Sequence, residues 1–165
     1  MPRKKAGPWL YYSQTARGYD ELHGAEQRRK VQFIISLLKP KKMWNVIDIG
    51  CGTGISMEGW PCRIEGVEPS REMAKAARSK GLKVWITPAE KLPFQENAFD
   101  LSISITSAHH FKKKAFQEIA RVSPRAVFSV LAKTAKQIKN LLEPFWILEE
   151  SHRFPPDIIF ICRRR

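Results

Sequence analysis

Short apolar runs divide the chain into predicted strands that are separated by predicted helices. Most of these runs are continuous rather than alternating, as expected for strands that are buried on both faces of a parallel sheet. The runs that predict strands lie at residues 46–49, 64–68, 82–87, 99–105, 126–131, 145–150 and 157–162. The last two flank Pro155-Pro156 and predict a closing hairpin. The pattern therefore predicts one α/β domain.

Apolar residues at helical spacing predict a long first helix over residues 21–38. This helix should bury one apolar face, with Arg28, Arg29 and Lys30 on its solvent side. Its apolar positions are Leu22, Ala25, Val31, Ile34, Ile35 and Leu38. The helix is therefore expected to pack on the sheet and to present a basic surface to solvent.

Three further helices follow from the same pattern. Ser70 is placed to cap the first of these, and Gly81 closes it. The inward positions of the next helix are Ala115, Phe116, Ile119 and Val122. The last helix carries an exposed basic stripe of residues at helical spacing, namely Lys133, Lys136 and Lys139.

The net charge of the chain indicates what class of partner it binds. The 165 residues include 29 Lys and Arg against 16 Asp and Glu, which gives a net charge of +13 and a pI of about 10.0. Such an excess favours a polyanionic partner, and nucleic acid is the first candidate. An ion-rich surface of a thermophile is the alternative, but such surfaces usually balance Lys with Glu. The densest basic clusters lie at residues 3–5, 28–30, 112–114 and 163–165.

The sequence shows no sign of a membrane or secretory location. No run of eighteen apolar residues is present, and no apolar segment follows the basic N-terminus. Cys51, Cys62 and Cys162 are far apart and match no zinc or disulfide spacing. We expect a cytoplasmic protein that has no membrane partner and no metal site.

A glycine-rich turn follows the first predicted strand. Residues 46–54 read V-I-D-I-G-C-G-T-G, and the glycines allow a tight turn in which the backbone approaches a ligand closely. The next strand ends at Glu68, where an acid can accept both hydroxyls of a ribose. A dinucleotide fingerprint would need a third glycine at Ile55, so the spacing favours a different nucleotide. A flavodoxin-like or dehydrogenase sheet with a chance glycine turn is the alternative.

The D-x-G-x-G-x-G pattern from Asp48 to Gly54 resembles the first motif of the class I S-adenosylmethionine-dependent methyltransferases. This resemblance covers residues 19–162. It implies a Rossmann-like, doubly wound and mostly parallel sheet of seven strands with a C-terminal antiparallel hairpin. Residues 19–165 would form the methyltransferase domain, and residues 1–18 would be a basic, aromatic extension.

The resemblance also implies S-adenosyl-L-methionine as cofactor and indicates which residues bind it. Asp48 would face its ammonium group, usually through water, and Glu68 its ribose. The segment 88–94 resembles the family's D-A-E-x-L-P-F loop, although Pro88 replaces the aspartate. The predicted cofactor-binding residues are Asp48, Gly50, Cys51, Gly52, Gly54, Glu68, Pro69, Ala89, Glu90 and Thr106.

The turn after the fourth strand is the predicted acceptor site, because ligands lie outside the carboxyl ends of parallel strands. It carries three predicted catalytic residues: Ser107, His109 and His110. The turn is a loose variant of the [D/N/S]-P-P-[Y/F/W] motif of exocyclic-amine transferases. It equally resembles the H-H-F turn of wobble-uridine carboxymethyl-ester transferases and of quinone-biosynthesis enzymes. A histidine with its ordinary pKa near about 6.5 could serve as a general base.

Basic residues that follow this turn and aromatic residues of the N-terminal segment predict how a substrate binds. The predicted substrate-binding residues are Tyr12, Tyr19, Lys112, Lys113 and Lys114. Basic residues interleaved with aromatics suit phosphate contacts and base stacking, whereas an aromatic lid on the edge of the sheet is the alternative for the N-terminal tyrosines.

The combined hypothesis is a methyltransferase acting on a base of ribosomal or transfer RNA, with an exocyclic amine such as cytosine N4 as the favoured acceptor. A small-molecule methyltransferase acting on a quinone precursor is a second hypothesis. A non-catalytic RNA-binding module on the same scaffold is a third. If residues 82–87 form the edge of the sheet, a small zinc-containing activator protein could bind there by extending it.

Overall fold

A computed structural model describes residues 8–165, with side chains from residue 18 onward. The basic cluster at residues 3–5 lies outside the described residues, and the side chain of Tyr12 lies outside the described side chains. Helix α1 (Pro8–Leu38) runs through residue 18 without a break. The division into an extension and a domain at that residue stays a prediction.

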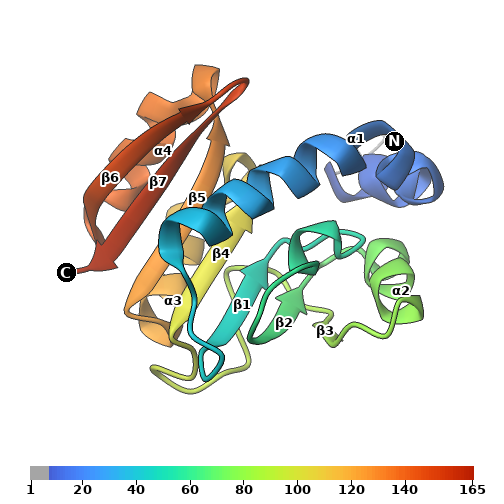
Figure 1. The fold of residues 1–165 in the computed structure, drawn as a ribbon, viewed down its shortest axis with the longest axis horizontal. Helices are drawn as coiled ribbons and strands as arrows, with labels where there is room; N and C mark the ends of the chain where they lie inside the picture. The colour runs from blue at the N-terminus through green and yellow to red at the C-terminus, as the bar shows by residue number, and fades with distance from the viewer. Residues whose placement is uncertain (1–7) are drawn as a thin grey trace, which may run out of the picture.

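Seven strands form one sheet in the order β3-β2-β1-β4-β5-β7-β6 (Figure 1). Their bounds are β1 Asn45–Ile49, β2 Arg63–Val67, β3 Val84–Trp85, β4 Leu101–Ile105, β5 Arg125–Leu131, β6 Trp146–Phe154 and β7 Asp157–Arg164. The first five strands are parallel, and β7 is antiparallel to both β5 and β6. This order confirms the predicted doubly wound sheet with its antiparallel hairpin.

The strand β3 is shorter than the predicted run of residues 82–87. Gly81, with a φ of 81°, turns the chain just before it, and Pro88 removes a backbone donor just after it. β3 is nevertheless the edge of the sheet, as expected, because among residues 8–165 its only sheet neighbour is β2.

Helices cover both faces of the sheet (Figure 1). On one face, Val31 and Ile34 of α1 pack against buried side chains of β1, β4 and β7. On the other face lie α3 (Lys113–Val122) and α4 (Ala135–Leu142), which pack against Phe128, Trp146 and Phe160. The helix α2 (Arg71–Ser79) lies beside the β3 edge. Three short 3₁₀ turns are η1 Ile55–Met57, η2 Ala108–His110 and η3 Ala132–Thr134.

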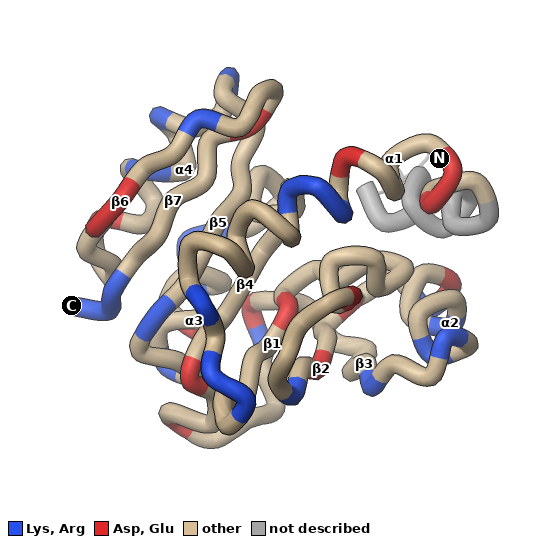
Figure 2. The backbone as a smooth tube through the Cα atoms, viewed as in Figure 1, with Lys and Arg blue, Asp and Glu red and all other residues tan. Residues whose placement is uncertain are grey.

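The helix caps and inward faces agree with the sequence. The Ser70 hydroxyl accepts a hydrogen bond from the Met73 N–H at 3.3 Å and caps α2. All four predicted inward residues of α3 are fully buried. The three lysines of the predicted basic stripe are exposed, but only Lys136 and Lys139 lie on α4, because Lys133 belongs to the preceding turn η3. The Lys and Arg residues are spread over α1, α2, α3 and α4 (Figure 2).

The prediction for the apolar face of α1 is wrong at three positions in the first part of the predicted helix. Leu22 is 75% exposed and Ala25 is exposed, whereas Lys30, expected on the solvent side, is 0% exposed. Leu22 and Val31 are separated by about two and a half helical turns, so they lie on opposite sides of the helix. The buried face instead includes Gly24, Gln27 and Lys30, as well as Val31. Arg28 and Arg29 are exposed, as predicted.

Within the part of the chain that the structure describes, no helix is both long and apolar enough to cross a membrane. The same residues contain no cluster of His, Cys, Asp or Glu that could hold a metal ion. The three cysteines are free thiols, with Cys51 and Cys162 buried.

Candidate active site

The carboxyl ends of β1, β2 and β4 border a cavity that is open to solvent. Seven residues of the predicted cofactor set line it: Gly50, Gly52, Glu68, Pro69, Ala89, Glu90 and Thr106. The opposite wall is formed by Thr106, Ser107 and His110, and Tyr19 of α1 also contributes. The structure therefore brings most of the predicted site residues around one cavity.

The glycine loop after β1 provides space at one position and close packing at others. At Gly52, where φ is 55°, a side chain would meet no atom within 4 Å, so the loop leaves room beside the cavity. At Gly50, a Cβ atom would lie 2.6 Å from the Ser107 hydroxyl oxygen, so only glycine fits there. Two predicted residues of the loop do not line this cavity. The Gly54 position packs closely on Leu82, and the Cys51 thiol lies against Gly66.

The Glu68 carboxylate is held by two backbone donors. Its Oε2 accepts a hydrogen bond from the Gly52 N–H at 2.9 Å, and its Oε1 accepts one from the Ser70 N–H at 2.8 Å. Burial raises the pKa of Glu68, and these two hydrogen bonds counteract part of that effect. Each carboxylate oxygen has a second lone pair, so the group can still accept hydroxyl protons from a ligand.

Asp48 lies fully buried beneath the same loop. One of its oxygens accepts a hydrogen bond from the Ser56 hydroxyl, and the other has no partner among the described residues. Burial, assisted by the negative charge of Glu68, raises the pKa of Asp48 to about 7. A cationic group reaching this oxygen through water would supply the missing partner. The unpaired oxygen, the fixed acid at Glu68 and the open space at Gly52 together fit the predicted cofactor.

The raised pKa of Asp48 predicts how stability depends on pH. Between the ordinary value of 3.8 and about 7, the folded protein binds a proton that the unfolded chain releases. The contribution of Asp48 to stability is therefore present at low pH and is lost as pH rises through about 7. We expect Asp48→Asn to raise the melting temperature at pH 8 and to leave it little changed at pH 5. Equal changes in melting temperature at both pH values would contradict the raised pKa of Asp48.

The acceptor turn is anchored to β1 and β4. The Ser107 hydroxyl donates to the Ile49 carbonyl at 2.9 Å and shares a hydrogen bond with the Ser104 hydroxyl at 2.7 Å. The His109 and His110 rings lie close together, with centroids 3.9 Å apart, and only His110 lines the cavity. The His109 Nδ1 has no partner within the described part of the chain.

Burial changes the expected chemistry of both histidines. It lowers the pKa of His109, and it lowers that of His110 to about 4, where the neighbouring His109 adds to the effect. Both rings are therefore neutral at pH 7 and can accept a proton or stack on a base. The sequence places these residues on the turn, but the ordinary pKa near 6.5 does not apply to them.

Exposed lysines surround the turn. Lys112, Lys113 and Lys114 follow it directly, and all three are exposed. Lys133 is close enough to His109 to lower the pKa of that imidazole. The Lys112 N–H donates to Glu90 at 3.3 Å, which joins the turn to the loop on the other side of the cavity.

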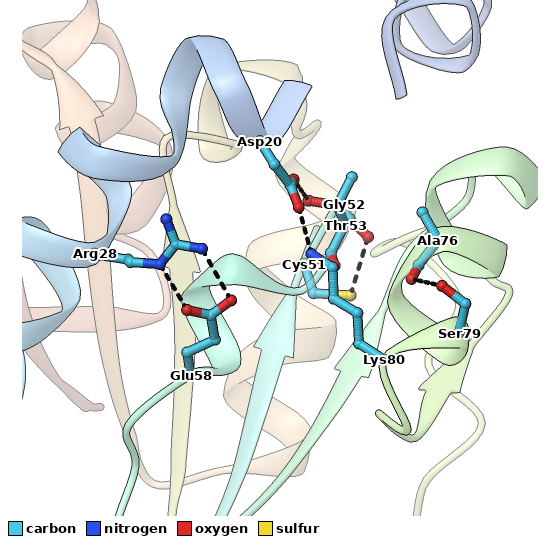
Figure 3. Close-up of polar contacts among 9 residues, drawn as sticks. All are labelled: Asp20, Arg28, Cys51, Gly52, Thr53, Glu58, Ala76, Ser79 and Lys80. Carbon is cyan, nitrogen blue, oxygen red and sulfur yellow. Dashed lines mark hydrogen bonds and ion pairs between the residues drawn. The ribbon is translucent and has the colours of Figure 1, made fainter. Parts of the chain in front are cut away.

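The helix α1 is clasped to the glycine loop by residues that the sequence did not single out for this role (Figure 3). Asp20 accepts a hydrogen bond from the Thr53 hydroxyl and pairs with Lys80 at 2.5 Å. Lys80 also donates to the Thr53 carbonyl at 3.0 Å. Nearby, Arg28 pairs with Glu58 at 2.7 Å. These contacts hold Tyr19 at the rim of the cavity, and no local sequence pattern could have revealed them.

Comparison with known protein families identifies a methyltransferase domain in this chain. Residues 47–129 match a family described as "Methyltransferase domain". An uncharacterised protein of Methanocaldococcus jannaschii is 38% identical over 123 residues, which are 73% of this chain and 49% of that protein. A probable tRNA methyltransferase 9B of Bos taurus is 33% identical over 117 residues, 67% of this chain and 25% of that protein. The chain thus spans half or less of the length of these relatives.

A third relative and two solved structures complete the comparison. The tRNA (carboxymethyluridine(34)-5-O)-methyltransferase of Arabidopsis thaliana is 35% identical over 83 residues, 47% of this chain and 20% of that protein. A putative S-adenosyl-L-methionine-dependent methyltransferase of Methanococcus maripaludis has a TM-score of 0.79 at 15% identity, covering 99% of this chain and 96% of that one. A putative methyltransferase of Haloferax volcanii in complex with the Trm112 activator has a TM-score of 0.78 at 13% identity, covering 97% and 99%.

Proposed function

We propose that this chain, which belongs to the class I S-adenosylmethionine-dependent methyltransferases, methylates a base of transfer RNA. The observation that carries the proposal is the cavity itself: Gly52 and Glu68 form one wall and the turn with Ser107 and His110 forms the other. When bound, the cofactor supplies an activated methyl group on a sulfonium. The chain's own residues then need mainly to bind and orient an acceptor beside it.

Three observations support RNA as the substrate. The net charge of +13 favours a polyanion, and the exposed lysines at residues 112–114 lie next to the turn. The relatives from Bos taurus and Arabidopsis thaliana are both described as tRNA methyltransferases. A quinone-precursor enzyme would gain little from such a charge, which is why we prefer RNA.

The turn suits an exocyclic amine as acceptor. Because Ser107 donates its proton to the Ile49 carbonyl, its oxygen accepts the hydrogen bond that it shares with Ser104, and its second lone pair stays available to accept a hydrogen bond from a substrate amine. Accepting this hydrogen bond would raise the electron density on the amine nitrogen of the substrate. The neutral His110 ring lines the cavity and can stack on the base.

A carboxylate oxygen on a modified uridine is a second candidate, favoured by the Arabidopsis relative and its printed activity. A carboxylate is already deprotonated at neutral pH, so its methylation needs neither Ser107 as acceptor nor a histidine as base. The nearby Lys112 and Lys113 would hold such an anionic acceptor by charge attraction.

One experiment tests the function and separates the two acceptors. The protein is incubated with cofactor carrying a labelled methyl group and with total tRNA from a strain lacking the gene, and the labelled nucleosides are identified. An N-methyl group survives mild alkali, whereas a methyl ester releases its label as methanol.

With an amine acceptor, Ser107→Ala should lower the rate about a hundredfold, as loss of one transition-state hydrogen bond typically does. No label in RNA would contradict the proposal.

The lysines beside the turn should dominate RNA binding. We expect Lys112→Glu/Lys113→Glu to weaken tRNA binding and to reduce the salt dependence, which has a log–log slope of about −0.7 per phosphate contact on single strands. The matched control is Lys41→Glu/Lys42→Glu, an equally exposed pair that precedes β1 at the opposite end of that strand. Equal losses in both variants would indicate only a general charge effect.

The free edge of β3 is a suitable binding surface for a protein partner. No strand of the described part of the chain pairs with the outer side of β3, and Ile86 just beyond it is 37% exposed. The Haloferax volcanii structure with the same fold is a complex with an activator. We propose that a small activator, which we expect to contain zinc, adds a strand to this edge. Co-purification that Ile86→Glu abolishes would support this, and full activity of the isolated chain would make the partner unnecessary.

A further inference from the structure

Lys30 is a charged residue in the interior of the protein. Its side chain is fully buried between α1 and the sheet. The ammonium donates to Asp157 at 2.9 Å, to the Thr106 hydroxyl at 2.8 Å and to Glu26 at 3.2 Å. All three of its protons therefore have acceptors, and one of these acceptors belongs to the wall of the cavity.

Asp157, the first residue of β7, collects donors from three separate segments. Its Oδ2 accepts hydrogen bonds from Lys30, from the Thr106 hydroxyl at 2.9 Å and from the Ser129 hydroxyl at 2.5 Å. Its side chain is as fully buried as that of Lys30. We call Lys30, Thr106, Ser129 and Asp157 the Lys30–Asp157 cluster. It joins α1, β5 and the C-terminal hairpin to Thr106, the residue after β4.

Thr106 is the member of the cluster that meets the cavity. Its φ of 54° lies in the left-handed region, which is unusual for a β-branched residue. Its N–H donates to the Ser129 carbonyl at 2.8 Å, and its hydroxyl is held by Lys30 and Asp157. The conformation of Thr106 sets the direction in which residues 107–110 leave the sheet.

Stability alone does not account for this cluster. Burying two charges is costly, and an apolar pair of similar size is often as stable. A strained residue persists only where the surrounding structure fixes it, and such residues gather at functional sites. The cluster supplies that constraint at the one strained residue in the cavity wall.

We propose that Lys30 and Asp157 are positioning residues, which fix Thr106 in its left-handed conformation and thereby orient the acceptor turn. Neither side chain lies on the cavity wall. Both bond to the Thr106 hydroxyl, and the negative charge of Asp157 also acts on the His109 imidazole, in the direction that raises its pKa. The consequence for the rate of methyl transfer rests on the proposed function, but the consequence for the order of the turn does not.

Two charge-neutral double variants test the proposal. Lys30→Met/Asp157→Asn removes both charges but keeps an acceptor for the Thr106 hydroxyl. Lys30→Met/Asp157→Leu removes both charges and the acceptor. Amide hydrogen exchange is measured at His110 and Phe111, whose N–H groups bond to the Ser107 and Ala108 carbonyls, and in β1 as the reference. We expect exchange in the turn to rise at least tenfold in the Leu variant alone, with β1 unchanged.

Unchanged exchange in the turn of the Leu variant, or a uniform rise that includes β1, would overturn the proposal. If the Leu variant does not fold, Thr106→Val removes only the hydroxyl link, and Thr106→Ser should restore turn protection.

In the labelled-methyl assay with tRNA, the Leu variant should lose at least tenfold in kcat while its Kd for S-adenosylhomocysteine changes less than threefold. A wild-type protein that methylates no tRNA would refute the proposed function but leave the exchange result valid.

Discussion

Replacing Glu68 by alanine should abolish most of the stabilisation that S-adenosylhomocysteine confers. For the wild-type protein, ligand at a hundred times its Kd should raise the free energy of unfolding by about 2.7 kcal/mol. The variant loses the acid that faces the cavity, and it also leaves the Gly52 and Ser70 N–H groups without their carboxylate partner. Affinity should therefore fall both through the lost hydroxyl contacts and through a loosened glycine loop.

Two further variants separate these causes in a thermal-shift assay. Glu58→Ala removes an exposed acid close to the loop that does not line the cavity, and it should keep the full ligand-induced shift. Glu68→Gln keeps an acceptor oxygen but loses the charge, so an intermediate shift is expected. A full shift in Glu68→Ala would place the ribose contact elsewhere, and no shift in the wild type would contradict cofactor binding.

The strands could be predicted because their signals are local, whereas their arrangement in a doubly wound sheet was implied by the resemblance to the methyltransferase family. Continuous apolar runs mark strands that are buried on both faces, and the glycines at 50, 52 and 54 mark the turn after the first of them. Since the carboxyl ends of parallel strands share one edge, Glu68 and Ser107 could be placed at the same site although they are far apart in the chain.

The errors in the prediction share a different origin, since they depend on contacts between distant segments. Lys30 is buried because Asp157 and Thr106 meet it, and neither is near it in sequence. The lowered pKa of His110 depends on burial by the surrounding fold, which sequence does not report. The clasp of Asp20, Thr53 and Lys80 likewise forms only once α1 lies over the glycine loop.

Different parts of the chain hold the two walls of the cavity. The residues predicted to bind the cofactor follow β1, β2 and β3, whereas the predicted acceptor turn is joined to α1 and the C-terminal hairpin through the Lys30–Asp157 cluster. Substitutions in the hairpin can therefore change the acceptor turn while the Glu68 contacts stay intact. Cofactor affinity and transfer rate should accordingly respond to different sets of residues.

Among the single substitutions proposed for this protein, Asp157→Asn should cause the largest loss in the free energy of unfolding. It leaves the Lys30 ammonium fully buried with its charge uncompensated except by the half-exposed Glu26. Breaking a buried pair in this way typically costs about 3–5 kcal/mol. Adding Lys30→Met should recover most of the loss, because the double variant has no unpaired charge. The free energy of unfolding in urea measures both effects.

The matched control is the exposed pair of Arg163 and Glu149, which lie 3.0 Å apart on the same hairpin. Glu149→Ala should cost at most about 1 kcal/mol, because solvent screens a surface pair. A loss in Asp157→Asn as small as that in the control would show that Lys30 finds another partner. Failure of the added Lys30→Met to recover stability would show that the hydrogen bonds of Asp157 to Thr106 and Ser129, rather than the charge balance, hold this part of the protein together.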